Sequence, residues 1–277
     1  MNDQGLEAIR LVGEYNRRTR ELRDDFYCLS KPANLLMHQQ TARSCIDALK
    51  RAALFPLAER RIADIGCGAG TWLMEFIQWG ALPENLRGID LMPDRLEMAR
   101  KRLPAADLHL GNAAELPWED ESCDIVTQFV VFTSIREVTL KRAIAKEMLR
   151  VLKPGGVVLW FDFRVDNPRN SAVEGIRKKE VLSLFPGCEV EVRPAVLAPP
   201  LCRSIAGRAW LLAEGLRTIP FLCTHYTGLI LKPKAAARNR TTNAGPPVWK
   251  PRSGNSDRSA LETARGISSR QGENDAR

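Results

Sequence analysis

Three glycines alternate in the segment RIADIGCGAGTW, at positions 66, 68 and 70. An apolar run precedes them and a helical pattern follows, which predicts a strand, a tight turn and a helix. Glycines in such a turn let a ligand approach the backbone, and the free N–H groups of a helix start favour electronegative atoms. The segment therefore predicts a small-molecule site at the end of a strand.

The spacing of the turn narrows the choice of ligand. The dinucleotide pattern G-x-G-x-x-G needs a glycine where the chain has Thr71, and no G-x-x-x-x-G-K-[ST] loop for nucleoside triphosphates is present. Asp90 ends the next apolar run, 20 residues after Gly70. An acid there can accept hydrogen bonds from ribose hydroxyls. NAD and S-adenosylmethionine both contain such a ribose, so these residues alone leave both open.

Four ordered segments resemble the class I S-adenosylmethionine-dependent methyltransferases, in particular their small-molecule, type-11-like subgroup. The resemblance is good over about 60–165 and looser over about 166–232. It implies S-adenosylmethionine as the cofactor and methyl transfer (EC 2.1.1.-) as the reaction, and it names no acceptor. The four segments are DIGCGAG (64–70), GIDLMPDRLEMAR (88–100), GNAAELPWEDESCDIV (111–126) and EMLRVLKPGGVVLW (147–160).

The same resemblance implies which residues bind the cofactor. Position 112 departs from the family, which usually has Asp there, although the oxygen of an Asn side chain can still accept a hydrogen bond from the adenine amine. The implied residues surround the methionine end (Asp64, Gly66, Gly68, Gln128), the ribose (Asp90) and the adenine (Leu91, Met92, Asn112, Ala113).

The acceptor should lie beyond the carboxyl ends of the strands, where parallel sheets bind their ligands. Asp162, near the end of a predicted strand, is the first candidate for a general base, although a supporting or loop carboxylate is the commoner role of such a residue. In-line displacement needs alignment above all, so a base is not obligatory. His38 and His225 are further candidates, although a structural role is the commoner one for such residues. Arg164 and Arg169 could bind an acidic acceptor, and simple solvation at the surface is equally open for both.

Short apolar runs alternate with helical patterns from residue 61 onward. This alternation predicts an α/β fold with a doubly wound, mostly parallel seven-stranded sheet of the Rossmann-like methyltransferase type. N-terminal helices precede the sheet, and a helical insert precedes its last strand. LKPGG (152–156) is interpreted as a turn. The strands are expected at 61–65, 86–91, 106–111, 123–132, 156–163, 188–194 and 225–233, and helices at about 70–79, 93–102, 137–152 and 174–185.

Three parts are predicted along the chain. Residues 1–57 would form a helical lid, 58–233 the methyltransferase domain with an insert at 194–224, and 234–277 a disordered basic tail, because the tail has few large apolar residues. The helix expected at 203–217 mixes leucines with arginines. It could cover the core, cap the pocket or rest on a membrane surface, and the first two readings are favoured.

Charge and cysteine content limit the classes of partner. The chain carries a formal charge of +8, but nine basic and four acidic residues lie in 234–277, so the folded body is only weakly basic. We therefore expect a small-molecule acceptor and no nucleic acid at the body. Seven cysteines without C-x-x-C spacing indicate no disulfide frame and no metal site. No apolar run is long enough to span a bilayer, peripheral membrane contact is possible, and a cytoplasmic location is expected.

Two other functions stay open. The fold could keep the cofactor site and act as a non-catalytic binding scaffold, because no obvious base stands out. A nucleic-acid methyltransferase is suggested by the basic tail, yet TQFVVF (127–132) stands where such enzymes carry an N/D-P-P-Y-type motif. The sequence predicts neither the acceptor nor the oligomeric state.

Overall fold

The computed structural model describes residues 3–22, 25–166 and 172–234. Apart from Lys234, the tail predicted to be disordered lies outside the described residues, and so do Asn167 and Arg169.

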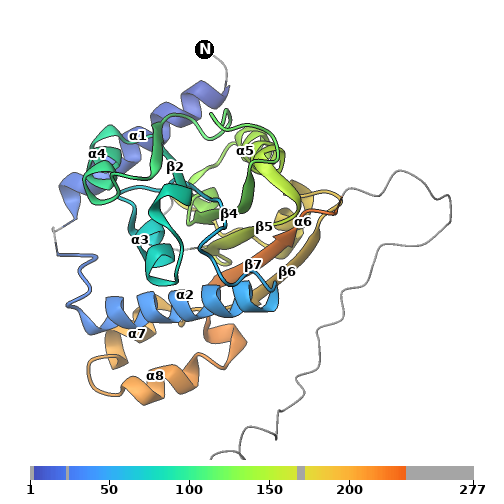
Figure 1. The fold of residues 1–277 in the computed structure, drawn as a ribbon. Helices are drawn as coiled ribbons and strands as arrows, with labels where there is room; N and C mark the ends of the chain where they lie inside the picture. Colours follow the sequence, from blue (N-terminus) through green and yellow to red (C-terminus); the bar gives the residue numbers. More distant parts are fainter. Residues whose placement is uncertain (1–2, 23–24, 167–171, 235–277) are drawn as a thin grey trace, which may run out of the picture. The chain divides into compact units, whose positions relative to one another are not determined.

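Seven strands form one sheet in the order β3-β2-β1-β4-β5-β7-β6 (Figure 1). β1 to β5 pair in parallel, and β7 runs antiparallel to both of its neighbours. The order reverses between β1 and β4, which is where open parallel sheets bind ligands. The predicted sheet is therefore confirmed. Its strands are β1 (Ile62–Ile65), β2 (Leu86–Asp90), β3 (Asp107–Leu110), β4 (Cys123–Phe129), β5 (Leu152–Phe163), β6 (Glu189–Pro194) and β7 (His225–Leu231).

The helices follow the strands in alternation, as the pattern of apolar residues predicts. They are α1 (Asp3–Glu21), α2 (Pro32–Arg51), α3 (Thr71–Gln78), α4 (Pro93–Arg102), α5 (Val138–Val151), α6 (Lys178–Leu184), α7 (Pro199–Ile205) and α8 (Trp210–Leu216). Three short 3₁₀ turns complete the chain: η1 (Pro83–Asn85), η2 (Phe132–Ser134) and η3 (Pro220–Leu222).

Three local predictions are wrong. The insert holds two short helices, α7 and α8, rather than one helix over 203–217, and Gly207 lies in the break between them. The fourth strand ends at Phe129 because Val130 has a positive φ of 59° and turns the chain away. The segment LKPGG belongs to the irregular start of β5, where the pairing with β4 shifts register, and is not a separate turn.

Two cores lie on opposite faces of the sheet. Along β5, Val158 and Trp160 pack into the core under α5 and α6, whereas Val157 and Leu159 pack into the core under α2, α3 and α4. Side chains alternate across a strand, so a sheet covered on both faces needs apolar residues at every position. The run VVLW meets this need, and all four side chains are buried.

α2 packs on the sheet with one part of its surface and on the insert with another. Its Cys45 and Leu49 belong to the sheet core, while Leu36 packs with residues of α7 and α8. Gln40 is fully buried and joins the two regions, because its amide donates to Glu214 at 3.0 Å and its oxygen accepts from the Leu197 N–H at 3.0 Å. The predicted division at residue 57 stays a prediction.

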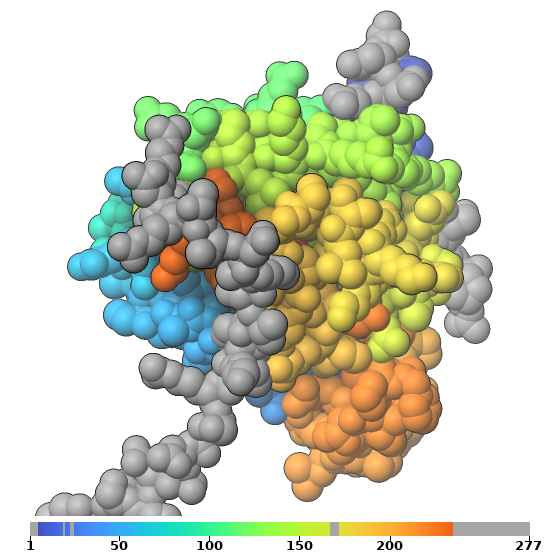
Figure 2. Space-filling model, turned by 90° about the vertical axis from the view of Figure 1, so that its right-hand side faces the viewer, coloured from blue at the N-terminus to red at the C-terminus, as the bar shows by residue number. Residues whose placement is uncertain are grey.

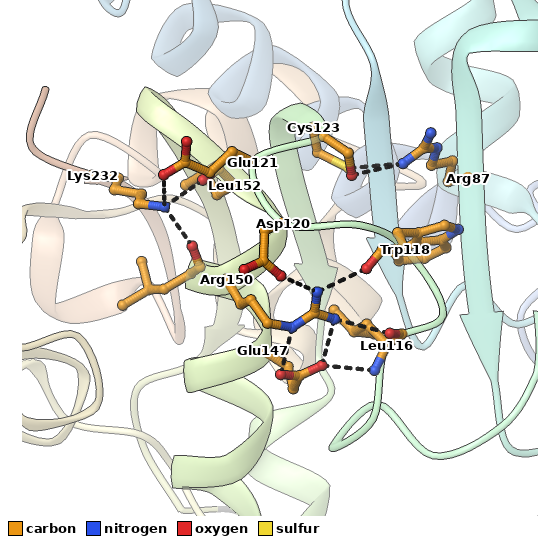
Figure 3. A network of polar contacts seen from close by, with 12 residues as sticks. Arg87, Leu116, Trp118, Asp120, Glu121, Cys123, Glu147, Arg150, Leu152 and Lys232 are labelled. Atoms are coloured by element: carbon orange, nitrogen blue, oxygen red, sulfur yellow. Dashed lines mark hydrogen bonds and ion pairs between the residues drawn. The ribbon is translucent and has the colours of Figure 1, made fainter. Parts of the chain in front are cut away.

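A network around Arg150 fixes the crossover from β3 to β4 (Figure 3). The guanidinium donates to the backbone oxygens of Leu116 and Trp118 at 2.9 and 2.8 Å, and it pairs with Glu147 and Asp120 at 2.7 Å each. These two carboxylates raise the pKa of Arg150 above its ordinary value. The network joins the end of α5 to a segment that has no regular structure of its own.

In the part of the chain that the structure describes, no helix has both the length and the apolar character needed to cross a bilayer.

Candidate functional site

The glycine turn joins β1 to α3, at the carboxyl edge of the sheet. Gly66 and Gly68 have φ angles of +71° and +53°, which residues with a Cβ rarely adopt. A Cβ on Gly66 would lie 2.6 Å from Val131 Cγ2, whereas a Cβ on Gly68 would meet no atom within 4 Å. Val131 thus closes one side of the turn, and the space beside Gly68 is open for a ligand.

Asp90 ties this turn to the end of β2. Its Oδ2 accepts a hydrogen bond from the Gly68 N–H at 2.8 Å, and its Oδ1 accepts one from the Met92 N–H at 2.8 Å. The residue is only half-buried. A carboxylate oxygen can accept more than one hydrogen bond, so both oxygens keep capacity for ribose hydroxyls. The structure thus brings together the two predicted features, the turn and the acid.

Asp64 lies inside the sheet rather than at its edge. It is 2% exposed, and its Oδ1 accepts a hydrogen bond from Thr127 Oγ1 of β4 at 2.7 Å. Burial raises the pKa of Asp64 to about 7, against the smaller opposing effect of the Thr127 hydrogen bond. Its carboxylate therefore joins β1 to β4 directly below the turn.

The residues predicted around the adenine lie on two neighbouring loops. Leu91 and Ala113 are partly buried against the core, and Met92 is buried. Asn112 accepts a hydrogen bond from the Ala114 N–H at 3.0 Å through Oδ1, which shapes the loop after β3. That oxygen has a second lone pair, so the substitution of Asn for the usual Asp is compatible with adenine binding.

Gln128 shapes the loop after β4. It is fully buried, its amide donates to the Phe161 oxygen at 3.2 Å, and its Oε1 accepts from the Val131 N–H at 3.0 Å. The same loop holds Val130 at φ +59°, a strained conformation for a β-branched residue. Gln128 therefore holds Val130 and Val131 in place, and its own side chain is not exposed at the edge of the sheet.

Asp162 is enclosed. Its side chain is 1% exposed. Oδ1 accepts hydrogen bonds from Thr133 Oγ1 at 2.5 Å and from the Phe163 N–H at 3.0 Å. Oδ2 accepts one from the Thr133 N–H at 3.2 Å. Burial raises its pKa to about 7, and the hydrogen bonds from Thr133 and the backbone oppose that shift. This arrangement matches the supporting role left open for Asp162, since it fixes η2 to β5.

Two other side chains near the end of β5, the candidate Arg164 and its neighbour Asp166, are held by nearby segments. The Arg164 guanidinium donates to the Pro220 oxygen at 2.9 Å and lies 5.0 Å from the centre of the Tyr226 ring. Asp166 is exposed and accepts from the Gly175 N–H at 2.8 Å. Both residues therefore stabilise the loops after β5.

Stacked rings follow the carboxyl edge from α2 across to β7. Trp72 stacks on Phe129 with centroids 4.2 Å apart and planes 9° apart, and His38 also stacks on Trp72, at 5.2 Å and 16°. Phe129 and Phe161 lie 6.0 Å apart, and His225 stacks on Phe161 at 4.9 Å. We call these five residues the aromatic row.

The histidines at the two ends of the row differ in their surroundings. His225 is 6% exposed, and burial lowers its pKa to about 3. His38 keeps about a sixth of its side chain exposed, and its Nε2 lies 2.8 Å from Glu75 Oε1. Burial thus holds the His225 ring neutral, whereas His38 has a carboxylate partner.

Trp72 and Glu75 were not singled out by sequence. They stand three residues apart in the first turns of α3, so they share one face of that helix. An aromatic residue directly after a glycine turn could have been noticed. Its contact with Phe129, however, depends on α3 and β4 being neighbours in space.

The glycine turn and its acid can now be compared with known proteins. Residues 63–160 match the family model of a methyltransferase domain, type 11. This chain contains a class I S-adenosylmethionine-dependent methyltransferase domain. S-adenosylmethionine is its cofactor, and the open space beside Gly68 with the lone pairs of Asp90 fits the ribose of that molecule.

The methyltransferase domain is similar to part of a demethylmenaquinone methyltransferase from Listeria welshimeri. The two are 33% identical over 106 residues, which cover 36% of this chain and 44% of that protein. The chain thus spans less than half the length of this curated relative.

Solved structures share the fold at low identity. A geranyl diphosphate C-methyltransferase from Streptomyces coelicolor, in complex with S-adenosyl-L-homocysteine, is 14% identical, with a TM-score of 0.51 over 70% of this chain and 77% of that one. A putative sarcosine dimethylglycine methyltransferase from Galdieria sulphuraria is 16% identical, with a TM-score of 0.52 over 70% and 86%.

Proposed function

We propose that this chain transfers the methyl group of S-adenosylmethionine to a hydroxyl or amine of a small, largely apolar molecule. The observation that carries the proposal is the pair formed by Gly68 and Asp90, which faces open space at the carboxyl edge of the sheet. The free cysteines support a cytoplasmic location as part of this proposal.

Asp90 would hold the ribose of the adenosine part, and the glycine turn with the Val130–Val131 loop would border the methionine part. When bound, S-adenosylmethionine supplies an electrophilic methyl group on a sulfonium sulfur. The chain has to align the acceptor with that group and exclude water. The strained loop after β4 suits this role, because Gln128 and the Phe161 oxygen hold it in one conformation.

The aromatic row supports an apolar acceptor. Trp72 and Phe129 are partly exposed and stand between α3 and the end of β4, next to the proposed position of the methyl group. Small-molecule sites are mostly apolar, with few polar groups. The names of the relatives, which act on demethylmenaquinone and geranyl diphosphate, agree with a small-molecule acceptor.

We further propose His38 as the residue that accepts a proton from the acceptor. Glu75 can accept a hydrogen bond from a protonated Nε2. In a neutral ring this leaves Nδ1 as the atom that can take up a proton. A ring oriented by a carboxylate is a common arrangement for a general base. Asp162 would act as a positioning residue instead, because its oxygens are already bonded to Thr133 and Phe163.

A methyl-transfer screen with labelled S-adenosylmethionine tests the proposal. Acceptors with hydroxyl, amine, glycosidic and acidic carbon positions are offered, and a methylated product from one class is expected. Tight cofactor binding without product from any class would support the scaffold alternative.

The two candidate residues are separated by kinetics. His38→Gln should lower kcat by about 10²–10⁴-fold while the cofactor dissociation constant stays unchanged. Asp162→Asn should affect stability more than kcat. A large loss of kcat in Asp162→Asn, with little change in His38→Gln, would instead assign the general base to Asp162.

A further inference from the structure

The insert between β6 and β7 forms a lobe with its own small core. Leu197, Cys202, Ala206 and Ala213 are buried there against Leu36 of α2. In the space-filling view the lobe projects from the body, at the lower right (Figure 2). The buried side chains of the two short helices all point into this small core.

The lobe nevertheless exposes large apolar side chains. Leu211 is 86% exposed, its neighbour Leu212 is also exposed, and Phe221 of η3 is 81% exposed. Soluble surfaces carry scattered apolar residues, but three such residues within eleven positions form an unusual concentration. Nothing in the folding of the lobe requires them, since Ala213 makes the buried contact of α8.

The charge of the lobe is one-sided. Residues 195–224 contain three arginines and a single acid, Glu214. Glu214 turns inward, where its oxygens accept from Gln40 at 3.0 Å and Arg43 at 2.5 Å. Arg203 and Arg208 are exposed, and Arg208 forms no ion pair within the described residues. The outer surface therefore combines apolar side chains with uncompensated positive charge.

The loop between α1 and α2 continues this surface. The Arg203 guanidinium lies 5.7 Å from the centre of the Phe26 ring, so the loop borders α7. The next residue, Tyr27, is 69% exposed, and Leu29 is exposed as well. The only charged residues of 25–31, Asp25 and Lys31, form a pair at 3.1 Å and add no net charge.

We propose that this surface docks on an anionic lipid bilayer. We define the docking face by Leu211, Leu212, Phe221, Arg203 and Arg208. The three apolar side chains would enter the interface, and the arginines would meet the anionic head groups. A second copy of the chain fits less well, because a symmetric contact would gather Arg203 and Arg208 of both copies in one interface, and the single acid of the lobe is already paired. The inference is independent of the proposed reaction.

The position of the docking face has a consequence for the site. Met37 of α2 packs both on the core of the lobe and on the cluster around Phe161. His38 is the next residue along the chain. The lobe and the aromatic row therefore share one helix, and docking would bring the acceptor side of the domain close to the lipid surface.

Cosedimentation with vesicles tests the proposal on the full chain. The vesicles are phosphatidylcholine alone or phosphatidylcholine mixed with phosphatidylglycerol. The wild type should bind the anionic vesicles, and added salt should weaken that binding. Leu211→Ser combined with Leu212→Ser and Phe221→Ser should weaken it by at least about tenfold, because one or two buried side chains already contribute that much.

The control replaces exposed apolar residues elsewhere. Leu82→Ser with Met98→Ser changes two exposed apolar side chains outside the lobe, 43% and 47% exposed, one directly before η1 and one on α4, and should leave vesicle binding unchanged. Arg203→Glu with Arg208→Glu should weaken binding to anionic vesicles and leave neutral vesicles unaffected. Circular dichroism and the melting temperature check that each variant is folded.

The basic tail is present in every variant, so it cannot mimic the expected difference. Equal binding of the triple serine variant and the wild type would show that the tail alone attracts the vesicles, and it would overturn the proposal. Light scattering of the free protein provides the second check. A dimer that dissociates in the triple variant would assign the face to a second copy instead.

Discussion

Asp90 serves the turn as well as the cofactor. Its two oxygens hold the N–H groups of Gly68 and Met92, so the carboxylate fixes the loops after β1 and β2 relative to each other. A ligand that binds both loops therefore finds its binding site preformed. Preorganisation of this kind lowers the entropy lost on binding.

Asp90→Ala should weaken S-adenosylmethionine binding by about 1–3 kcal/mol, because a buried ribose hydroxyl loses its acceptor. Calorimetry measures the change. Asp94→Ala is the matched control, since Asp94 is an exposed acid in the first turn of α4. Undiminished binding by the Asp90 variant would disprove the proposed ribose site.

The two glycines of the turn should respond differently to alanine. Both substitutions strain a positive φ by about 1–2 kcal/mol. Gly66→Ala also drives a Cβ toward Val131 and should lower the melting temperature clearly, whereas Gly68→Ala meets no atom of the protein. Gly68→Ala should therefore stay folded and lose cofactor affinity. Equal melting temperatures for the two variants would contradict this assignment.

Asp162 should make stability depend on pH. Burial raises its pKa from 3.8 to about 7. The folded state then keeps a proton that the unfolded chain releases, so this residue's contribution to the free energy of unfolding falls as pH rises through that window. Asp64 acts in the same direction, and His225, whose pKa is lowered to about 3, acts in the opposite one.

Asp162→Asn isolates the contribution of that residue. The advantage of the wild type over the variant should shrink by about 2 kcal/mol between pH ~5 and pH ~7. Urea unfolding at several pH values measures it. If the two stability profiles run parallel, Asp162 is ionised in the folded protein.

Among the elements, the crossover from β3 to β4 depends most on a single side chain. Asn112 and Ala113 begin this segment, and Arg150 of α5 holds its middle through Leu116 and Trp118 (Figure 3). The segment that begins with Asn112 and Ala113 is thus held in position by a side chain of α5.

Arg150→Met should lower the free energy of unfolding by about 1–3 kcal/mol, because two backbone oxygens and two carboxylates lose a partner. It should also weaken cofactor binding, although Arg150 makes no contact with the proposed cofactor residues. Urea unfolding and calorimetry measure the two effects. Arg142→Met, an exposed arginine of the same helix, should change neither. A stability loss without any change in affinity would separate the network from the adenine loop.

At the scale of the whole molecule, α1 is bonded to the connection between β4 and α5. Glu7 accepts from the Arg136 N–H at 2.6 Å, and Arg10 donates to the Ser134 oxygen at 2.6 Å. The helix is therefore fastened to the loop between β4 and α5, beside the site. This fastening supports the predicted lid, which stays a prediction.

Glu7→Ala should speed amide exchange in α1 by roughly tenfold, because one buried hydrogen bond and one ion pair are lost. Hydrogen exchange followed by mass spectrometry reads this directly. Glu14→Ala is the control, since Glu14 pairs with Arg17 and Arg18 of the same helix and does not fasten it to the body. Equal exchange in both variants would mean that Glu7 does not hold the helix.

The sequence by itself determined the sheet, the glycine turn and the acid at the end of β2. These depend on local patterns: apolar runs define strands, glycines allow positive φ, and Asp90 is the last residue of its own strand. The same patterns failed where a few residues decide the backbone. Val130 ended a strand early, and the insert broke into two helices, because both depend on contacts with distant segments.

Only the tertiary structure decided how the site residues are used. Asp162, Gln128 and Asp64 lie on the predicted strands, yet each is buried and bonded to a neighbouring segment rather than facing the open side. The pairing of His38 with Glu75 and the stack of Trp72 on Phe129 join residues from different elements. The direction in which a side chain points, and its contacts with other elements, are set by tertiary packing. The spacing of residues within one segment of the chain therefore does not predict them.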